Sequence, residues 1–207
     1  GTLYAFGLAN ELERWDGRRW INESKPGSAG TKGIRDMLEV DGSPLAVGDD
    51  GRFIRQPAGA RRWENEAVLG DDAFGGIWGA RDDRVWMVSE NGRILDWDGE
   101  KWTETRVPSR PDFRAVTGTS ATDVWAVGTG GAAYRFDGST WTEVRTPVDG
   151  ELLAVHALAP NDVFAVGGLT GGGIALRFDG ATWSRMTLPP SAGSLRGVYG
   201  ARPDEVW

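Results

Sequence analysis

The residues best suited to chemistry recur at matched positions of a repeated apolar segment. Five copies of this segment have the sequences IRDML, FGGIW, FRAVT, LLAVH and LRGVY, beginning at Ile34, Phe74, Phe113, Leu152 and Leu195. The second position is arginine in three copies and the fifth is a ring in three, with LRGVY carrying both, which gives six candidates: Arg35, Arg114, Arg196, Trp78, His156 and Tyr199. Guanidinium groups offer paired donors to a carboxylate, and rings can stack on a sugar or a peptide side chain. We predict that these six residues form a ligand site.

A second interpretation of the arginines stays open. Each could form an ion pair with a nearby acid such as Asp36, Asp112 or Glu151, which would leave only a structural role. The side chains of a strand alternate between its two faces, so positions three apart share a side only where the strand twists or bulges. The predicted site therefore depends on local strand geometry.

Catalysis by a nucleophile or a metal is disfavoured by the residue counts. His156 is the only histidine and there is no cysteine, whereas a catalytic triad needs a histidine beside its nucleophile and a zinc site usually needs several such ligands. The acidic loops lack the dense oxygen ligands of a calcium loop. A glycoside hydrolase with paired carboxylates remains an alternative, although no spacing singles out a pair. No catalytic residue, metal or cofactor is predicted.

Net charge and hydropathy exclude some classes of binding partner. The 207 residues include 30 acidic and 23 basic side chains, a net charge of −7, and a general nucleic-acid binder would normally carry a basic patch. No apolar run reaches the roughly 18 residues that a membrane helix requires. A glycan or a peptide is therefore the expected partner, with no nucleic acid and no membrane insertion.

A period of about 40 residues indicates the fold. The motifs LYAFG, PLAVG, VWMVS, VWAVG and VFAVG begin at positions separated by 41, 41, 39 and 39 residues. A tryptophan follows each motif with the same period, at Trp20, Trp63, Trp102, Trp141 and Trp183. We expect these rings to pack between repeats. Repeats of this length with four strands each are typical of propellers.

One repeat, residues 113–147, illustrates the unit. Four short β-branched or alternating runs are separated by turn residues, which predicts a four-stranded antiparallel meander. Asp137-Gly138 is expected to form a two-residue hairpin loop with positive φ at both residues, and Gly130-Gly131 another. Only the second repeat departs from the Asp-Gly turn, because Gln56–Trp63 has the sequence QPAGARRW.

The fold class predicted from these repeats is an all-β, five-bladed β-propeller in one domain, residues 1–207. Its repeats are approximately 1–33, 34–73, 74–112, 113–151 and 152–194, followed by a closing strand in 195–207. Residues 195–200 are expected to pair with residues 3–7, because ring closure removes free sheet edges. Residues 206–207 and 3–4 share one repeat position, so a piece of a longer propeller without independent activity is the alternative.

The repeats resemble those of bacterial β-propellers built of DVWAVG…DGxxW units, and more distantly Asp-box and kelch-like propellers. That resemblance implies a secreted or otherwise extracytoplasmic protein whose motif carries no catalytic residue. An Asp-box spaces its residues one position wider than Asp137, Gly138 and Trp141, so its sialidase association is not transferred. The predicted function is a non-catalytic binding or structural module, lectin-like or peptide-binding, with the glycoside hydrolase as runner-up.

Overall fold

The structure is a computed structural model. It describes residues 3–7, 11–23, 33–40, 42–60, 63–68, 70–80, 84–168, 172–202 and 205–206. Within these ranges the chain consists of β-strands and one short 3₁₀ turn. No helix in the described part is long and apolar enough to cross a membrane.

Successive strands form antiparallel sheets in chain order. A three-stranded sheet comes first, with β1 (Tyr4–Phe6), β2 (Leu12–Trp15) and β3 (Trp20–Asn22). Two four-stranded sheets follow: β4 (Ile34–Val40), β5 (Ser43–Gly48), β6 (Arg52–Arg55) and β7 (Glu64–Val68), then β8 (Phe74–Ala80), β9 (Arg84–Ser89), β10 (Arg93–Trp97) and β11 (Trp102–Arg106). The next two contain β12 (Phe113–Ser120), β13 (Asp123–Gly128), β14 (Ala133–Phe136) and β15 (Trp141–Glu143), then β16 (Leu152–Ala159), β17 (Asp162–Gly167), β18 (Ile174–Phe178) and β19 (Trp183–Arg185). These sheets confirm the predicted four-stranded unit.

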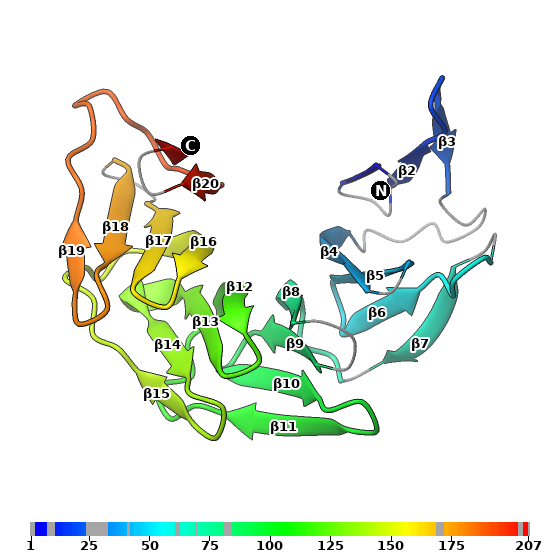
Figure 1. Cartoon of the computed structure of the whole chain (residues 1–207), viewed down its shortest axis with the longest axis horizontal. Coiled ribbons are helices and arrows are strands. Elements are labelled where there is room, and N and C mark those ends of the chain that lie inside the picture. The colour runs from blue at the N-terminus through cyan, green and yellow to red at the C-terminus, as the bar shows by residue number, and fades with distance from the viewer. Residues whose placement is uncertain are drawn as a thin grey trace.

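The sheets stand side by side along an arc (Figure 1). The first strands of the complete sheets, β4, β8, β12 and β16, lie on the inside of the arc, and β7, β11, β15 and β19 lie on the outside. The inner strands approach closely: a Cβ added to Gly76 would lie 3.2 Å from the Cα atom of Ala115 on the neighbouring inner strand. This crowding explains why the third position of the repeated segment is mostly glycine or alanine.

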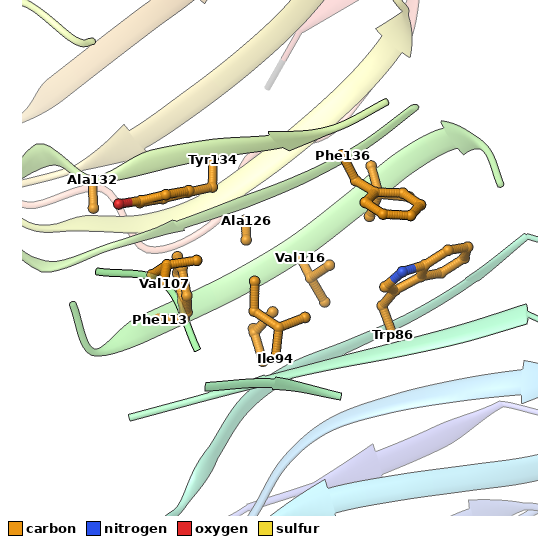
Figure 2. Packing of buried hydrophobic residues seen from close by; sticks show 11 residues of the cluster. Trp86, Ile94, Val107, Phe113, Val116, Ala126, Ala132, Tyr134 and Phe136 are labelled. Atoms are coloured by element: carbon orange, nitrogen blue, oxygen red, sulfur yellow. The ribbon is translucent and has the colours of Figure 1, made fainter. Parts of the chain in front are cut away.

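Apolar side chains fill the space between neighbouring sheets. Strands β5, β13 and β17 are buried along their whole length, and β5 and β13 contribute residues to the clusters on both of their faces. Figure 2 shows one such layer, in which Trp86 and Ile94 of one sheet meet Val116, Ala126 and Phe136 of the next. Equivalent clusters join the other successive pairs of sheets. Burial between sheets, and not within any one of them, therefore stabilises the fold.

The recurring tryptophans of the fourth strands contact aromatic rings of the preceding sheet in three of the five repeats. Trp63 lies edge-on to Tyr4, Trp102 to Phe53 and Trp183 to Trp125, with ring centroids 5.9, 5.7 and 5.3 Å apart. Trp20, in the first sheet, is 45% exposed. The expected packing between repeats is therefore confirmed for Trp63, Trp102 and Trp183 and does not hold for Trp20.

The Asp-Gly turns differ from the prediction. Phe136 pairs with Trp141, so four residues form the loop instead of two. Only the glycine, Gly138, has positive φ, at 99°. The Asp137 carboxylate accepts hydrogen bonds from the backbone N–H groups of Ser139 and Thr140, and closes the turn through its side chain. The Gly130-Gly131 turn has positive φ at both residues, as predicted.

The expected closure of the ring is not what the structure shows. Residues 195–199 form no strand, and β20 (Gly200–Arg202) pairs with β21 (Glu205–Val206). The backbone carbonyl of Gly200 lies 3.0 Å from Nε2 of His156, which places β20 beside the inner strand β16. The C-terminal segment thus continues the arc in the same direction, and the first and last sheets lie at its two ends (Figure 1).

Candidate functional site

A β-bulge sets the direction of the side chain at the second position of the repeated segment in each inner strand. The pairing of β4, β8, β12 and β16 with their neighbours shifts register between the first and third residue of each segment. The bulged residue is therefore Arg35, Gly75, Arg114 or Leu153. A bulge leaves its extra residue outside the ladder and redirects the side chain, so the arginines occupy a position that repeats from sheet to sheet.

Arg35 is held by two carboxylates. Its Nε donates to Oδ1 of Asp49 at 2.7 Å, and one Nη lies 4.0 Å from Oε1 of Glu90 in the next sheet. Asp49 also accepts a hydrogen bond from the backbone N–H of Gly33. The arginine side chain is 37% exposed, so the cluster borders solvent.

Arg114, two sheets further along the arc, also contacts a carboxylate of the sheet that follows its own. Its Nε donates to Oε1 of Glu151 at 2.6 Å, and Glu151 immediately precedes β16 of the following sheet. The five charged residues Arg35, Asp49, Glu90, Arg114 and Glu151 are called the rim below. They lie at the ends of the strands where the inner strands begin and the second strands end, on one edge of the arc.

The other predicted residues occupy different places. Arg196 is exposed in the segment before β20 and makes no ion pair with any residue that the structure describes. Trp78 packs on Trp86, with ring centroids 5.5 Å apart, at the border of a buried cluster. The rings of His156 and Tyr199 make a tilted contact with centroids 5.1 Å apart, and Tyr199 is 61% exposed.

The structure therefore brings Arg35 and Arg114 to one edge, and brings His156 together with Tyr199 between β16 and the segment before β20. Trp78 belongs to the packing between sheets. A ligand role for these residues stays a prediction. Asp49 and Glu90 were not among the residues predicted for this site, although both directly follow a second-strand motif, PLAVG or VWMVS.

A buried carboxylate lies on the innermost strand. Asp36 accepts hydrogen bonds from the backbone N–H groups of Met37 and of Ile77 in the next sheet, both at 2.9 Å. Burial raises the pKa of Asp36 to about 6, and the two N–H donors oppose this rise. Asp36 therefore links two inner strands and carries the raised pKa as a consequence of its position.

The acidic loops between first and second strands have a structural explanation. Asp123 forms an ion pair with Arg135, whose guanidinium lies over the ring of Trp125. Asp162 pairs with Arg177 in the same way, over Phe164. In the part of the chain that is described, no three His, Cys, Asp or Glu side chains are grouped as metal ligands.

Comparison with known proteins shows the fold. The chain matches no protein-family model and no curated protein sequence significantly. Among solved structures, the computationally designed Ika8 protein is similar with a TM-score of 0.72 and 13% identity, over 100% of this chain and 67% of that one. The WD40 repeats of RRP9 give 0.72 and 11%, over 95% and 66%. YCF48 bound to D1 peptide gives 0.62 and 12%, over 98% and 83%.

These similarities support a β-propeller fold and, at such low identity, nothing beyond the fold. The chain spans about two thirds of the length of the Ika8 and RRP9 chains. Because unrelated functions share this architecture, function has to be argued from the surface of this chain.

Proposed function

We propose that this protein is a non-catalytic binding module that holds a peptide of a partner protein against the rim. The observation that carries the proposal is a set of partly exposed ion pairs at one edge of the arc, of which Arg35–Glu90 and Arg114–Glu151 each join two neighbouring sheets. Binding groups placed on a rigid scaffold are typical of interaction domains.

The chemistry of the rim suits an acidic or C-terminal peptide group. Arg114 bonds its described partner through Nε only, which leaves the other guanidinium nitrogens to donate hydrogen bonds to a ligand carboxylate. Partly exposed ion pairs contribute little to stability, so a ligand can replace an internal partner at small cost. Arginine favours such planar, paired contacts with carboxylates. YCF48, which has a similar fold, was solved with a peptide bound, so a peptide is the first ligand class to test.

A glycan is the second candidate, because one observation favours it. The exposed ring of Tyr199, which lies tilted against His156, offers a flat surface of the kind that sugars use. The hydrolase alternative has no comparable support, since no carboxylate pair stands out in the described part of the chain.

The proposal is tested by selecting peptides from a display library on the immobilised protein. Replacing Arg35 and Arg114 together by alanine should weaken the selected peptide at least about tenfold, because hydrogen bonds to charged groups each contribute about 1.5–3 kcal/mol. Arg106→Ala is the matched control, since Arg106 is an exposed arginine on the outer strand β11 that also pairs with a carboxylate. Unchanged binding by the double variant would contradict a role for the rim.

A glycan array and a panel of chromogenic glycosides separate the alternatives. Glycan binding that Tyr199→Ala abolishes, without turnover, would support the second candidate. Turnover of a glycoside that is lost when an Asp or Glu is substituted would contradict both binding proposals and support a glycoside hydrolase.

A further inference from the structure

The second repeat breaks a pattern that the other four repeats keep. In those four, the residue at the end of the third strand is aromatic and its ring packs on the tryptophan that opens the fourth strand. The pairs are Trp15–Trp20, Trp97–Trp102, Phe136–Trp141 and Phe178–Trp183, with centroids 5.3 to 5.5 Å apart. In the second repeat Gln56 takes this position, and Pro57–Ala60 begin a longer turn in place of Asp-Gly.

The substitution puts an amide where a ring would stand. Gln56 is 8% exposed, and its Oε1 accepts a hydrogen bond from the hydroxyl of Tyr4 at 3.0 Å. Trp63, which opens the fourth strand region of this repeat, packs on Tyr4 of the preceding sheet. Gln56 thus presents a polar amide between the first two sheets, where the other repeats present a ring.

Gln56 lines a pocket of about 550 Å³ between these two sheets, called the Gln56 pocket below. Its wall includes Tyr4, Arg14, Glu23, Glu39, Pro44 and Gln56. Glu39 and Pro44 flank the turn between β4 and β5, whereas the rim lies at the other ends of these two strands. The pocket and the rim therefore belong to opposite edges of the arc.

Among the described charged groups of the pocket wall, one carboxylate forms no ion pair with a described residue. Arg14 donates to Glu23 at 2.7 Å, which neutralises that pair. Glu39 is exposed and forms no ion pair with a described residue. Burial raises the pKa of Tyr4, Arg14 lowers it, and Glu23 and Glu39 raise it again, so both carboxylates act on the phenol oxygen at the pocket wall.

We propose that the Gln56 pocket binds the side chain of an arginine or lysine from a peptide. The unpaired carboxylate of Glu39 offers a counter-charge, and the Gln56 and Glu23 oxygens offer acceptors. The ring of Tyr4 supplies a face for a cation, and Pro44 and Pro57 supply apolar surface for the aliphatic stem. This inference does not depend on ligand binding at the rim.

The test is an NMR titration of the isotope-labelled protein with N-acetyl-arginine amide and N-acetyl-lysine amide. The Gln56 side-chain amide and the Gly42 backbone amide, both at the pocket wall, should shift in a saturable way. N-acetyl-citrulline amide, which has nearly the shape of the arginine probe and no charge, should bind at least a few-fold more weakly. Equal shifts with citrulline, or no saturable shift up to the solubility limit of the probes, would overturn the proposal.

Two variants assign the binding to this pocket. Gln56→Phe restores the ring of the other repeats and should abolish the titration shifts, while Glu39→Gln should weaken binding about two- to fivefold, as expected for an exposed charge pair. Glu100→Gln, an exposed carboxylate in the turn between β10 and β11, is the control and should bind as wild type does. The Arg35 and Arg114 double variant should also bind the probes normally, which separates this pocket from the rim.

Glu39→Gln keeps the test valid if Gln56→Phe fails to fold, because Glu39 is exposed at the end of its strand. Undiminished binding by Glu39→Gln, or by a folded Gln56→Phe variant, would overturn the proposed site.

Discussion

The carboxylate of Asp36 makes the stability of the arc depend on pH in an unusual direction. Its pKa in the folded protein, about 6, lies above the ordinary value of 3.8 that applies in the unfolded chain. The folded state therefore binds the proton more tightly than the unfolded chain does. The stability that Asp36 contributes through this proton is greatest below pH 4 and is lost as the pH rises through 6.

The size of the effect follows from the shift. About two pKa units correspond to about 3 kcal/mol at 1.36 kcal/mol per unit, and this is an upper value because Asp36 is not fully buried. In Asp36→Ala this dependence disappears. Alanine fits the position, because Ala115 and Ala154 occupy it in two other inner strands, but the N–H groups of Met37 and Ile77 lose their acceptor at every pH, at a cost of about 1–3 kcal/mol.

The assay is urea unfolding followed by tryptophan fluorescence at pH 4, 5, 6 and 7 for wild type and Asp36→Ala. The variant should be clearly less stable at pH 4, and the difference should shrink or reverse by pH 7. Glu100→Ala, which changes an exposed carboxylate, should follow wild type throughout. A difference between Asp36→Ala and wild type that is the same at all four values would refute the reasoning.

Four further substitutions test other parts of the structure by the same unfolding measurement. Trp125→Ala removes a fully buried ring and should cost about 3–5 kcal/mol, whereas Trp20→Ala, at a 45% exposed site, should cost about 1 kcal/mol or less; similar costs for both would contradict the assigned burial. Hydrogen bonds from Thr140 and Ser139 lower the pKa of Asp137 to about 2, so wild type should lose stability as the pH falls from 4 to 2, and this loss should be smaller in Asp137→Ala. A loss of the same size in the variant would contradict the hydrogen bonds assigned to this turn. Gly76→Leu should destabilise the protein because its side chain would press on the neighbouring inner strand, and a neutral result would mean that the strands lie further apart.

The repeated unit could be predicted from the sequence because its signals are local. Apolar runs, turn residues and a 39- to 41-residue period are visible without any knowledge of packing. The length of the Asp-Gly loop could not be predicted in the same way, since aromatic residues flank it at Phe136 and Trp141 and only the observed pairing fixes the register. The prediction of ring closure was wrong for a related reason. The curvature of the arc depends on how neighbouring sheets pack, and the sequence of a single repeat does not show this.

The candidate sites could also be predicted only in part, because some of their features are visible in the aligned repeats and others depend on contacts between distant residues. The arginine positions were visible in the alignment of repeats, but the bulge that aims Arg35 and Arg114 is a property of strand pairing. The departure at Gln56 was also visible. Its consequence was not, because the hydroxyl that bonds Gln56 comes from Tyr4, 52 residues earlier in the chain.

Hydrogen exchange measured by mass spectrometry, with and without a peptide selected on the immobilised protein, tests the proposed binding function most directly. Bound peptide should slow exchange in the segments that contain the rim residues Arg35, Asp49, Glu90, Arg114 and Glu151, while the outer strands β11 and β15 exchange at their free rates. Protection confined to the outer strands, with the rim segments unchanged, would contradict the account.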